Sequence, residues 1–312
     1  MDTKIEAITT KFALNFCESK VASLEGAGTE FDDDRAAFLA KLLVTAGHRD
    51  EYSASLRVPP LNSYAKHPTE RKYVYLFDFP SGTSARKPVS LHDQILSKEA
   101  EDSLSLNNRF RVAKTIARSL GAFHSDGWLH KSIRSHAVKF FFPEGSSAPD
   151  TKNPYLTDFE FSRPDKMDTG NIDRPVKIDQ DIYRHPDRFG PPTDRFRKVH
   201  DVYALGVVLL EIGLWETAIN LYEAFMEMEK GKGNMTGKRI QKEFLKLANE
   251  RLGHLMGSSY KDAVVTCLDG SLGKLHGTDE LDRDFVTIFQ REIVRKIEQS
   301  GPKEAKAGTW DE

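Results

Sequence analysis

Three short motifs in this sequence could bind a phosphate or a metal ion, but each lacks part of the residue set that such a site needs. Gly-Ala-Gly at residues 26–28 begins like a nucleotide-binding glycine loop, yet the third glycine position is Phe31. Gly-Lys at 237–238 is similar to the end of a phosphate-binding loop, but Lys232 stands where the earlier glycine should be and Arg239 where a serine or threonine should follow. His130 and His136 have no third metal ligand nearby. We interpret these motifs as a turn, a solvated connection and a buried, hydrogen-bonded His130.

Four further segments follow one another in a fixed order and together form a stronger signal. Residues 129–137 (LHKSIRSHA) precede an apolar segment, and residues 156–160 (LTDFE) place Asp158 directly after another one. A long polar loop then ends in residues 183–187 (YRHPD), and residues 201–211 (DVYALGVVLLE) are almost entirely apolar. The candidate chemistry of the chain is concentrated in these segments.

Hydrophobic patterns predict the elements that must position these segments. Apolar residues at steps of three and four indicate an amphipathic helix at 110–124, and the nearly continuous apolar stretch at 201–214 indicates a helix buried on every side. Further helices are expected at 35–43, 241–252, 260–268 and 282–299, and strands at 11–16, 73–79, 137–142 and 155–156. Proline-rich residues 162–199 predict a long surface loop, residues 230–238 a turn and 301–312 a frayed tail.

Composition excludes several classes of protein. The chain has 312 residues, which suggests about two domains or one large two-lobed domain. A formal charge of −2 argues against a dedicated nucleic-acid binder, and two cysteines cannot form a disulfide framework. The first residues lack a signal-peptide pattern, and the longest apolar run, 202–210, is too short to span a bilayer. We therefore expect a cytoplasmic protein without a transmembrane segment.

The ordered segments resemble the protein-kinase fold. The resemblance runs from residue 73 to the last helix, and residues 201–211 resemble the buried central helix of the kinase large lobe. More narrowly, the phrases WLHKSIR, PYLTDFEFSRPD and VYALGVVLLEIGLWE resemble kinase-like domains of fungal heterokaryon-incompatibility proteins, which often carry a HeLo-type domain. The resemblance implies an α+β, two-lobed fold with a reduced N-lobe at 1–80, a mainly helical C-lobe at 81–300 and a flexible tail at 301–312.

The resemblance also implies that catalysis is lost. In the kinase motif H-R-D-L-x-x-x-N, the catalytic aspartate is replaced by Ser132 and the metal-binding asparagine by Ala137. The D-F-G motif keeps the metal-binding aspartate as Asp158, but Glu160 replaces its glycine. Loss of the base alone could lower the rate by about 10²–10⁴-fold. Asp158 remains the candidate ligand for Mg-ATP, with a structural acid as the alternative.

The small lobe lacks the parts that would hold ATP. Too few residues precede the first predicted strand for a glycine-rich lid, and the position of the ATP-binding lysine falls on Asn15, Phe16 or Cys17. Lys20 is the nearest lysine. The helix predicted at 35–43 has no glutamate to pair with such a lysine, since Glu30 lies before it.

Other family positions imply structural roles. Asp201 should hold the backbone of the loop at 130–137 by hydrogen bonds, with His130 packed beneath it. Pro186 and Asp187 should anchor the end of the long loop, with Asp187 pairing an arginine for which Arg283 is the candidate. Residues in the same loop that could be phosphorylated are Ser162, Thr169 and Tyr183, although Lys131 replaces the arginine that usually receives a loop phosphate.

Three hypotheses follow. The first is a pseudokinase that acts as a regulatory or scaffolding module for protein partners in fungal incompatibility or cell-death signalling. The second is an unorthodox protein Ser/Thr kinase that binds Mg-ATP through Asp158. The third is a truncated gene product that lacks an upstream lid and effector domain.

Overall fold

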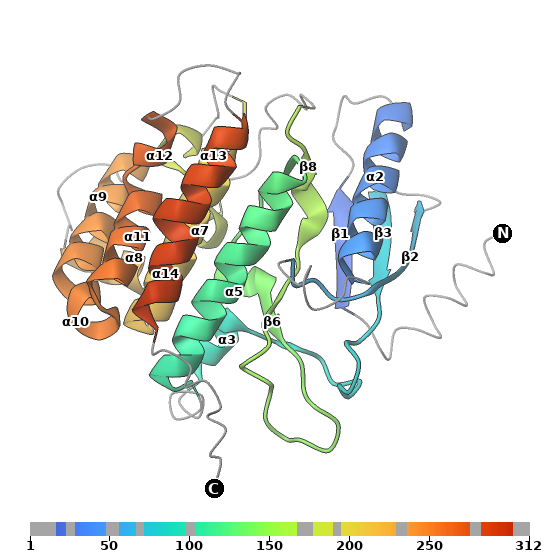
Figure 1. The fold of residues 1–312 in the computed structure, drawn as a ribbon, viewed down its shortest axis with the longest axis horizontal. Coiled ribbons are helices and arrows are strands. Elements are labelled where there is room, and N and C mark those ends of the chain that lie inside the picture. The colour runs from blue at the N-terminus through green and yellow to red at the C-terminus, as the bar shows by residue number, and fades with distance from the viewer. Residues whose placement is uncertain are drawn as a thin grey trace, which may run out of the picture.

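A small sheet and a group of helices form the two sides of the molecule. The computed structural model describes residues 17–22, 29–47, 56–66, 72–97, 104–166, 177–189, 195–228, 236–274 and 282–301. The sheet and helix α2 (Thr29–Gly47) lie on one side, and most other helices lie beyond helix α5 (Leu106–Ser125) on the opposite side (Figure 1). The combination of helices with small antiparallel sheets confirms the predicted α+β class.

The sheet beside α2 has three antiparallel strands. Its order is β1 (Cys17–Ala22), β3 (Lys72–Phe77) and β2 (Leu61–Lys66). Alternate side chains of β3 are buried: Tyr73, Tyr75 and Phe77. Tyr75 Oη donates a hydrogen bond to the carbonyl oxygen of Ala36 at 2.9 Å, so the central strand is fixed to the helix.

Two smaller sheets lie between these sides. One has the order β4 (Val89–Ser90), β6 (Val138–Phe140), β7 (Tyr155–Leu156), and the other pairs β5 (Trp128–Leu129) with β8 (Arg163–Pro164). Helix α3 (Leu91–Leu96) begins directly after β4, where Ser90 and Asp93 form a capping box. The strands β5, β6, β7 and β8 flank the loop at 130–137 and the segment at 157–162, and therefore position both.

Helix α7 (Lys198–Leu214) is the centre of the helical side. Nearly all of its side chains are buried. It packs on α11 (Ser258–Leu268) so closely that a Cβ atom at Gly206 would lie 2.6 Å from the Cβ of Cys267. Tyr260 of α11 donates a hydrogen bond to the carbonyl oxygen of Leu209 at 2.8 Å. The apolar sequence of α7 is thus explained by packing on all sides.

The remaining helices complete this side. They are α6 (Ile178–Asp181), α8 (Ala218–Met228), α9 (Gly237–Leu247), α10 (Gly253–Met256), α12 (Ser271–Lys274), α13 (Asp282–Phe289) and α14 (Arg295–Ser300). Wide π-helical turns, Ala248–Leu252 and Gln290–Val294, continue α9 and α13. In the part of the chain that the structure describes, no single helix is long and apolar enough to cross a membrane; α7 and α8 reach that length together only across an 86° bend.

Most predicted elements are confirmed, with some corrections. The helices expected at 35–43, 110–124, 201–214, 241–252, 260–268 and 282–299 are present, as are the strands at 73–79, 137–142 and 155–156. The loop at 162–199 contains β8, α6 and a 3₁₀ turn, and residues 237–238 begin α9 rather than belonging to a turn. Helix α2 begins at Thr29, so Glu30 lies within it rather than before it. The strand expected at 11–16 and the tail from 302 onward lie outside the described residues.

Candidate functional site

One buried carboxylate, Asp201, organises the loop at 130–137. Its Oδ2 accepts a hydrogen bond from the backbone N–H of His130 at 2.8 Å, and its Oδ1 accepts one from the N–H of Lys131 at 2.8 Å. His124 Nε2 of α5 lies 3.2 Å from the same Oδ2. Asp201 is fully buried, and these contacts satisfy both of its oxygens. The carboxylate therefore joins α5, α7 and the loop, which is the structural role that the resemblance implies for it.

His130 is a core residue of this loop. Its ring is completely buried and lies against the rings of Phe123 and Phe159 at centroid distances of 5.7 and 5.1 Å. Its Nδ1 accepts a hydrogen bond from the backbone N–H of Ser132. Burial lowers the pKa of His130 to about 4, so the ring is neutral at pH 7. His130 supports the loop and has no exposed face for a ligand.

Asp158 is paired with an arginine. The residue has a left-handed backbone with φ 64°, and its Oδ2 lies 3.0 Å from Nη2 of Arg134. Both side chains are partly buried, at 22% exposure for Arg134 and 29% for Asp158. A guanidinium therefore already neutralises the carboxylate that would have to bind a cation. The sequence interpretation missed Arg134, although the residue stands inside the LHKSIRSHA segment.

Three residues, Ser132, Ala137 and Glu160, stand where the kinase motifs have an aspartate, an asparagine and a glycine. Ala137 is fully buried at the end of a 3₁₀ turn, Ser135–Ala137, and offers no ligand atom on its side chain. Ser132 and Glu160 line a cavity next to the loop. Of Ser132, Ala137 and Glu160, only Glu160 carries a charged side chain. The hydroxyl of Ser132 is not a carboxylate and cannot replace one as a base at neutral pH.

Helix α2 contributes a second arginine that the sequence interpretation missed. Arg35 is 3% exposed, and its Nε and Nη2 donate hydrogen bonds to the carbonyl oxygens of Ser162 and Glu160, both at 3.0 Å. Leu39, one helical turn later, is completely buried. An arginine four residues before a buried leucine lies on the apolar face of the helix, and this spacing could have indicated a buried arginine. Arg35 thus fixes the segment after Asp158 to the helix.

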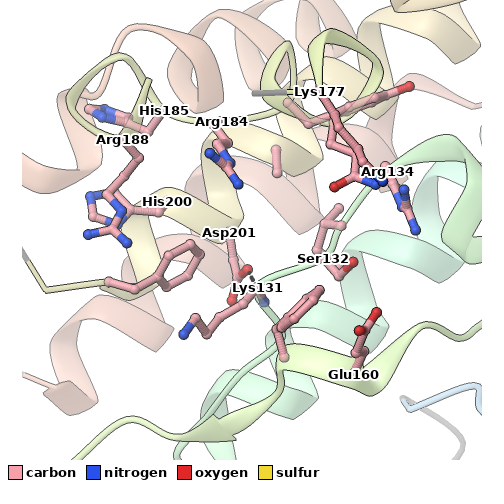
Figure 2. Close-up of a pocket in the computed structure, with 16 residues that line it drawn as sticks. Lys131, Ser132, Arg134, Glu160, Lys177, Arg184, His185, Arg188, His200 and Asp201 are labelled. Carbon is pink, nitrogen blue, oxygen red and sulfur yellow. Dashed lines mark hydrogen bonds between the residues drawn. The ribbon is translucent and has the colours of Figure 1, made fainter. Parts of the chain in front are cut away.

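A cavity of about 380 Å³ opens between the loop at 130–137 and the segment at 177–204. Five basic side chains line it against two acidic ones. The basic residues are Lys131, Arg134, Lys177, Arg184 and Arg188, and the acidic ones are Glu160 and Asp201. Figure 2 shows His185, Arg188 and His200 together at one end of this cavity and Arg134 and Lys177 at the other. Arg134 is paired with Asp158, Arg184 with Asp181, and Asp201 is bonded to the loop. The rest of the lining holds three basic side chains against Glu160, and this balance favours an anion.

Pro186 and Asp187 lie in a 3₁₀ turn, Pro186–Arg188, beside this cavity. Asp187 Oδ2 lies 3.3 Å from Nδ1 of His185. The side chain of Arg283, the predicted partner of Asp187, lies outside the described residues. His185, Asp187 and His200 offer ligand atoms within 4.8 Å of one another, which makes them the candidate metal ligands of the described residues.

The candidate phosphorylation sites in the described residues are buried. Ser162 is fully buried and its Oγ donates a hydrogen bond to the carbonyl oxygen of His130. Tyr183 is 5% exposed, and its hydroxyl donates to Oε1 of Glu211 at 2.8 Å. Neither hydroxyl is open to a modifying enzyme in this structure. Thr169 lies outside the described residues.

The sheet places Lys20 in β1, opposite Val74 of β3. Cys17 begins the same strand, whereas Asn15 and Phe16 lie outside the described residues. Strand β1 packs against the turn Phe159–Phe161, so Lys20 belongs to a strand that approaches the segment after Asp158.

Comparison with protein families gives a match over most of the chain. Residues 63–304 match the family described as Domain of unknown function (DUF7580). The chain belongs to this family. No curated protein matches the chain.

The DUF7580 match runs from β2 to just beyond α14. It contains the loop at 130–137, Asp158, Arg134 and the whole lining of the basic cavity. Strand β1 and helix α2 precede it, so Lys20 and Arg35 lie outside the matched residues.

Proposed function

We propose that this chain is a protein-kinase-like, two-lobed domain that has lost phosphoryl transfer and acts as a regulatory or scaffolding binding module. The sheet with α2 would form the reduced N-lobe, and the helical side would form the C-lobe. The order of elements supports this proposal: β1 and α2 come first, β2 and β3 follow, and the buried helix α7 lies under the loop at 130–137. The partner would be a protein, in a cytoplasmic signalling pathway of the fungal incompatibility type that the sequence resembles.

The observation that carries the proposal is the ion pair between Arg134 and Asp158. A divalent cation bound to Asp158 would have to displace a guanidinium held at 3.0 Å and then share a small volume with that positive charge. Asp158 is the one metal-binding residue of the two kinase motifs that this chain retains. The contact therefore occupies the one metal-binding carboxylate of the two motifs that this chain retains.

Two further substitutions remove the chemistry as well as the metal. Ser132 cannot accept the proton of an attacking hydroxyl as a carboxylate does, and Ala137 cannot bind the second metal ion. The missing base affects proton transfer, and the missing ligand affects metal binding. Restoring one of these residues would therefore not restore catalysis.

The alternative is an unorthodox protein kinase that still binds Mg-ATP through Asp158. The feature that favours it is the position of Asp158, which is 29% exposed and lies two residues after strand β7. In this alternative Arg134 would move from the carboxylate to a phosphate of ATP. Phosphoryl transfer distinguishes the two hypotheses.

The experiment is thermal unfolding of the purified chain with millimolar ATP, with and without Mg²⁺, next to an Asp158→Ala variant. A ligand present at about 100 times its Kd stabilises a protein by roughly 2.7 kcal/mol, which gives a readily measured shift in Tm. We expect no Mg²⁺-dependent shift in either protein. A matched assay with radiolabelled ATP and a generic protein substrate should give the same incorporation for both.

Two results would contradict the proposal. A Mg²⁺-dependent shift that disappears in Asp158→Ala would show an intact metal site. Transfer above the level of Asp158→Ala would establish the kinase alternative.

A further inference from the structure

The end of the basic cavity next to α7 is built from hydrogen-bond donors and positive charges. His200 in the first turn of α7, His185 before the 3₁₀ turn and Arg188 within it lie together there (Figure 2). The ring of Phe196 lies 5.0 Å from that of His200, measured between centroids. This cluster lies at the opposite end of the cavity from Arg134, the residue that pairs with Asp158.

His200 has a buried ring nitrogen without a partner. The residue is 2% exposed, and its Nε2 has no hydrogen-bond partner among the described residues. Its Nδ1 accepts a hydrogen bond from the backbone N–H of Arg197 at 3.1 Å. In a neutral imidazole one nitrogen accepts and the other carries the proton, so Nε2 is an N–H donor. A buried donor that lacks an acceptor costs free energy, and an acceptor that reached it would recover this cost.

Two cationic side chains approach the same aromatic ring at this end. Lys131 Nζ lies 5.6 Å from the centroid of Phe196, and the guanidinium carbon of Arg188 lies 5.8 Å from it. Each of the two side chains therefore lies next to the ring of Phe196, which in turn contacts the ring of His200. Lys131 and Arg188 both line the cavity, so an anion that entered the cavity would contact their side chains.

The same geometry argues against a metal ion at His185, Asp187 and His200. Nδ1 of His185 accepts a hydrogen bond from the N–H of Asp187, as Nδ1 of His200 accepts one from Arg197. In the neutral ring of His200, Nε2 therefore carries the proton and offers no lone pair to a cation. Burial lowers the pKa of His200, and His185, Arg197 and Arg188 lower it further, so a second positive charge on this ring is disfavoured. The cluster is suited to an oxyanion.

We propose that this end of the cavity, formed by His200, Arg188 and Lys131, binds the phosphate group of a phosphorylated segment from a protein partner. This inference deepens the proposed binding module, because it names the chemistry by which the module would recognise a partner. A phosphate offers several acceptor oxygens and about two negative charges, which match one buried N–H and two cations.

The rest of the cavity supports a peptide rather than a free ion as the source of the phosphate. Its volume of about 380 Å³ exceeds what one phosphate needs. Its lining also includes the apolar residues Ile133, Phe161 and Ala204, and the basic residues Arg134 and Lys177 lie at the other end. Apolar and basic surface next to the phosphate would contact the residues that flank a phosphorylated side chain.

The experiment measures binding of three fluorescein-labelled alanine-rich peptides that differ only at their central residue. The residue is phosphoserine, glutamate or serine, and inorganic phosphate is tested as a competitor. We expect the phosphoserine peptide to bind more tightly than the other two and more tightly than inorganic phosphate. Arg188→Gln should weaken its binding about tenfold or more, since hydrogen bonds to charged groups contribute strongly. Arg251→Gln makes the same charge change at an exposed residue outside the cavity lining and should bind normally.

Nuclear magnetic resonance of ¹⁵N-labelled histidine locates the site without a mutation that could disturb folding. The Nε2–H signal of His200 should shift on addition of the phosphoserine peptide, while that of buried His130 should remain. Equal affinity for the phosphoserine and serine peptides, or an unchanged His200 signal at millimolar peptide, would overturn the proposal. Equal affinity for the phosphoserine peptide and inorganic phosphate would overturn the peptide source.

These outcomes are separate from those of the proposed function. Loss of phosphopeptide binding would leave the results with Mg-ATP unchanged, and an active kinase would be detected by transfer whether or not the peptide binds. The two proposals can therefore fail independently.

Discussion

At the scale of single residues, the pair formed by Arg134 and Asp158 decides whether a cation can bind. Arg134→Met removes the guanidinium and keeps a side chain of similar length. We expect Mg-ATP to raise the Tm of this variant more than that of the original chain, because the carboxylate is then available to Mg²⁺. The double variant Arg134→Met/Asp158→Ala is the control and should show no such shift. An equal response of all three proteins would show that Arg134 does not compete with a cation.

A second residue, Glu211, is a buried acid in the centre of α7. Its Oε1 accepts hydrogen bonds from Ser135 Oγ, the Tyr183 hydroxyl and the N–H of Ala218, while burial raises its pKa to about 7 from an ordinary 4.5. Between these pH values the folded state holds a proton that the unfolded state has released. The contribution of Glu211 to the free energy of unfolding therefore falls as the pH rises from about 4.5 to about 7.

Glu211→Gln tests this sign, since glutamine keeps an acceptor but cannot ionise. The free energy of unfolding of the original chain minus that of the variant should decrease with pH across this range. The expected slope is of order 1.4 kcal/mol per pH unit. Urea unfolding at several pH values measures it. A difference that is independent of pH would mean that Glu211 titrates near its ordinary pKa.

At the scale of elements, two glycines show how closely α7 is packed. A Cβ at Gly206 would lie 2.6 Å from the Cβ of Cys267, an atom close to the backbone of α11, whereas a Cβ at Gly213 would lie 2.5 Å from Cδ2 of Leu252. The end of a leucine side chain can move, but a Cβ moves only with its helix. Gly206→Ala should therefore destabilise the fold by about 1–3 kcal/mol, and Gly213→Ala by less. Urea midpoints of the two variants give the comparison, and equal losses would show that α7 and α11 can separate.

Helix α2 holds the segment after Asp158 through Arg35. Arg35→Lys keeps the charge but cannot donate to two carbonyl oxygens in the same planar geometry. We expect faster hydrogen exchange of the backbone amides at 159–162 in this variant and unchanged exchange in α7. Lys41→Ala, on the exposed side of the same helix, is the matched control. Unchanged exchange at 159–162 would mean that the sheet alone orders the segment.

The elements differ in how far the sequence could predict them. Helix α7 is evident because its apolar residues are continuous, and α5 because its apolar residues recur every three or four positions. Strand β2 was missed because its sequence LNSYAK is largely exposed and has no apolar alternation. Helices α3 and α8 were also missed, and α3 has only six residues.

The candidate site was only partly predictable for a different reason. The segments that contain Asp158 and Asp201 could be identified because each is a continuous motif. The contacts of Arg35 with Ser162 and of Arg134 with Asp158 join positions far apart in the sequence, and a single sequence holds no signal for such pairs. The assignment of Nε2 of His200 as an N–H donor likewise depends on a hydrogen bond from Arg197, which becomes evident only in the folded structure.

At the scale of the whole molecule, buried neutral histidines should make the fold sensitive to acid. Burial lowers the pKa of His130 and His136 to about 4 and that of His200 to about 2, against an ordinary 6.5. Below about pH 6.5 the unfolded chain binds protons at these positions that the folded chain does not bind. Three such histidines outweigh the opposite effect of Glu211, so unfolding near pH 5 should take up about two protons.

The free energy of unfolding should therefore rise with pH between about 4.5 and 6.5. Urea unfolding in buffers of constant ionic strength measures this dependence. A variant with His136→Gln, the most accessible of the three, should reduce the slope by about one proton. A flat profile in the original chain would show that the three rings gain protons in the folded state.

The contact between Gly206 and Cys267 has a consequence for redox chemistry. Cys267 is 2% exposed and lies against another helix, and burial raises the pKa of its thiol well above the ordinary range. Peroxide and electrophiles react with the thiolate, so the folded protein presents them with almost no target at this position. In a cell under oxidative stress, a modified Cys267 would therefore mark a molecule that had already opened. The modification would record damage rather than transmit a signal.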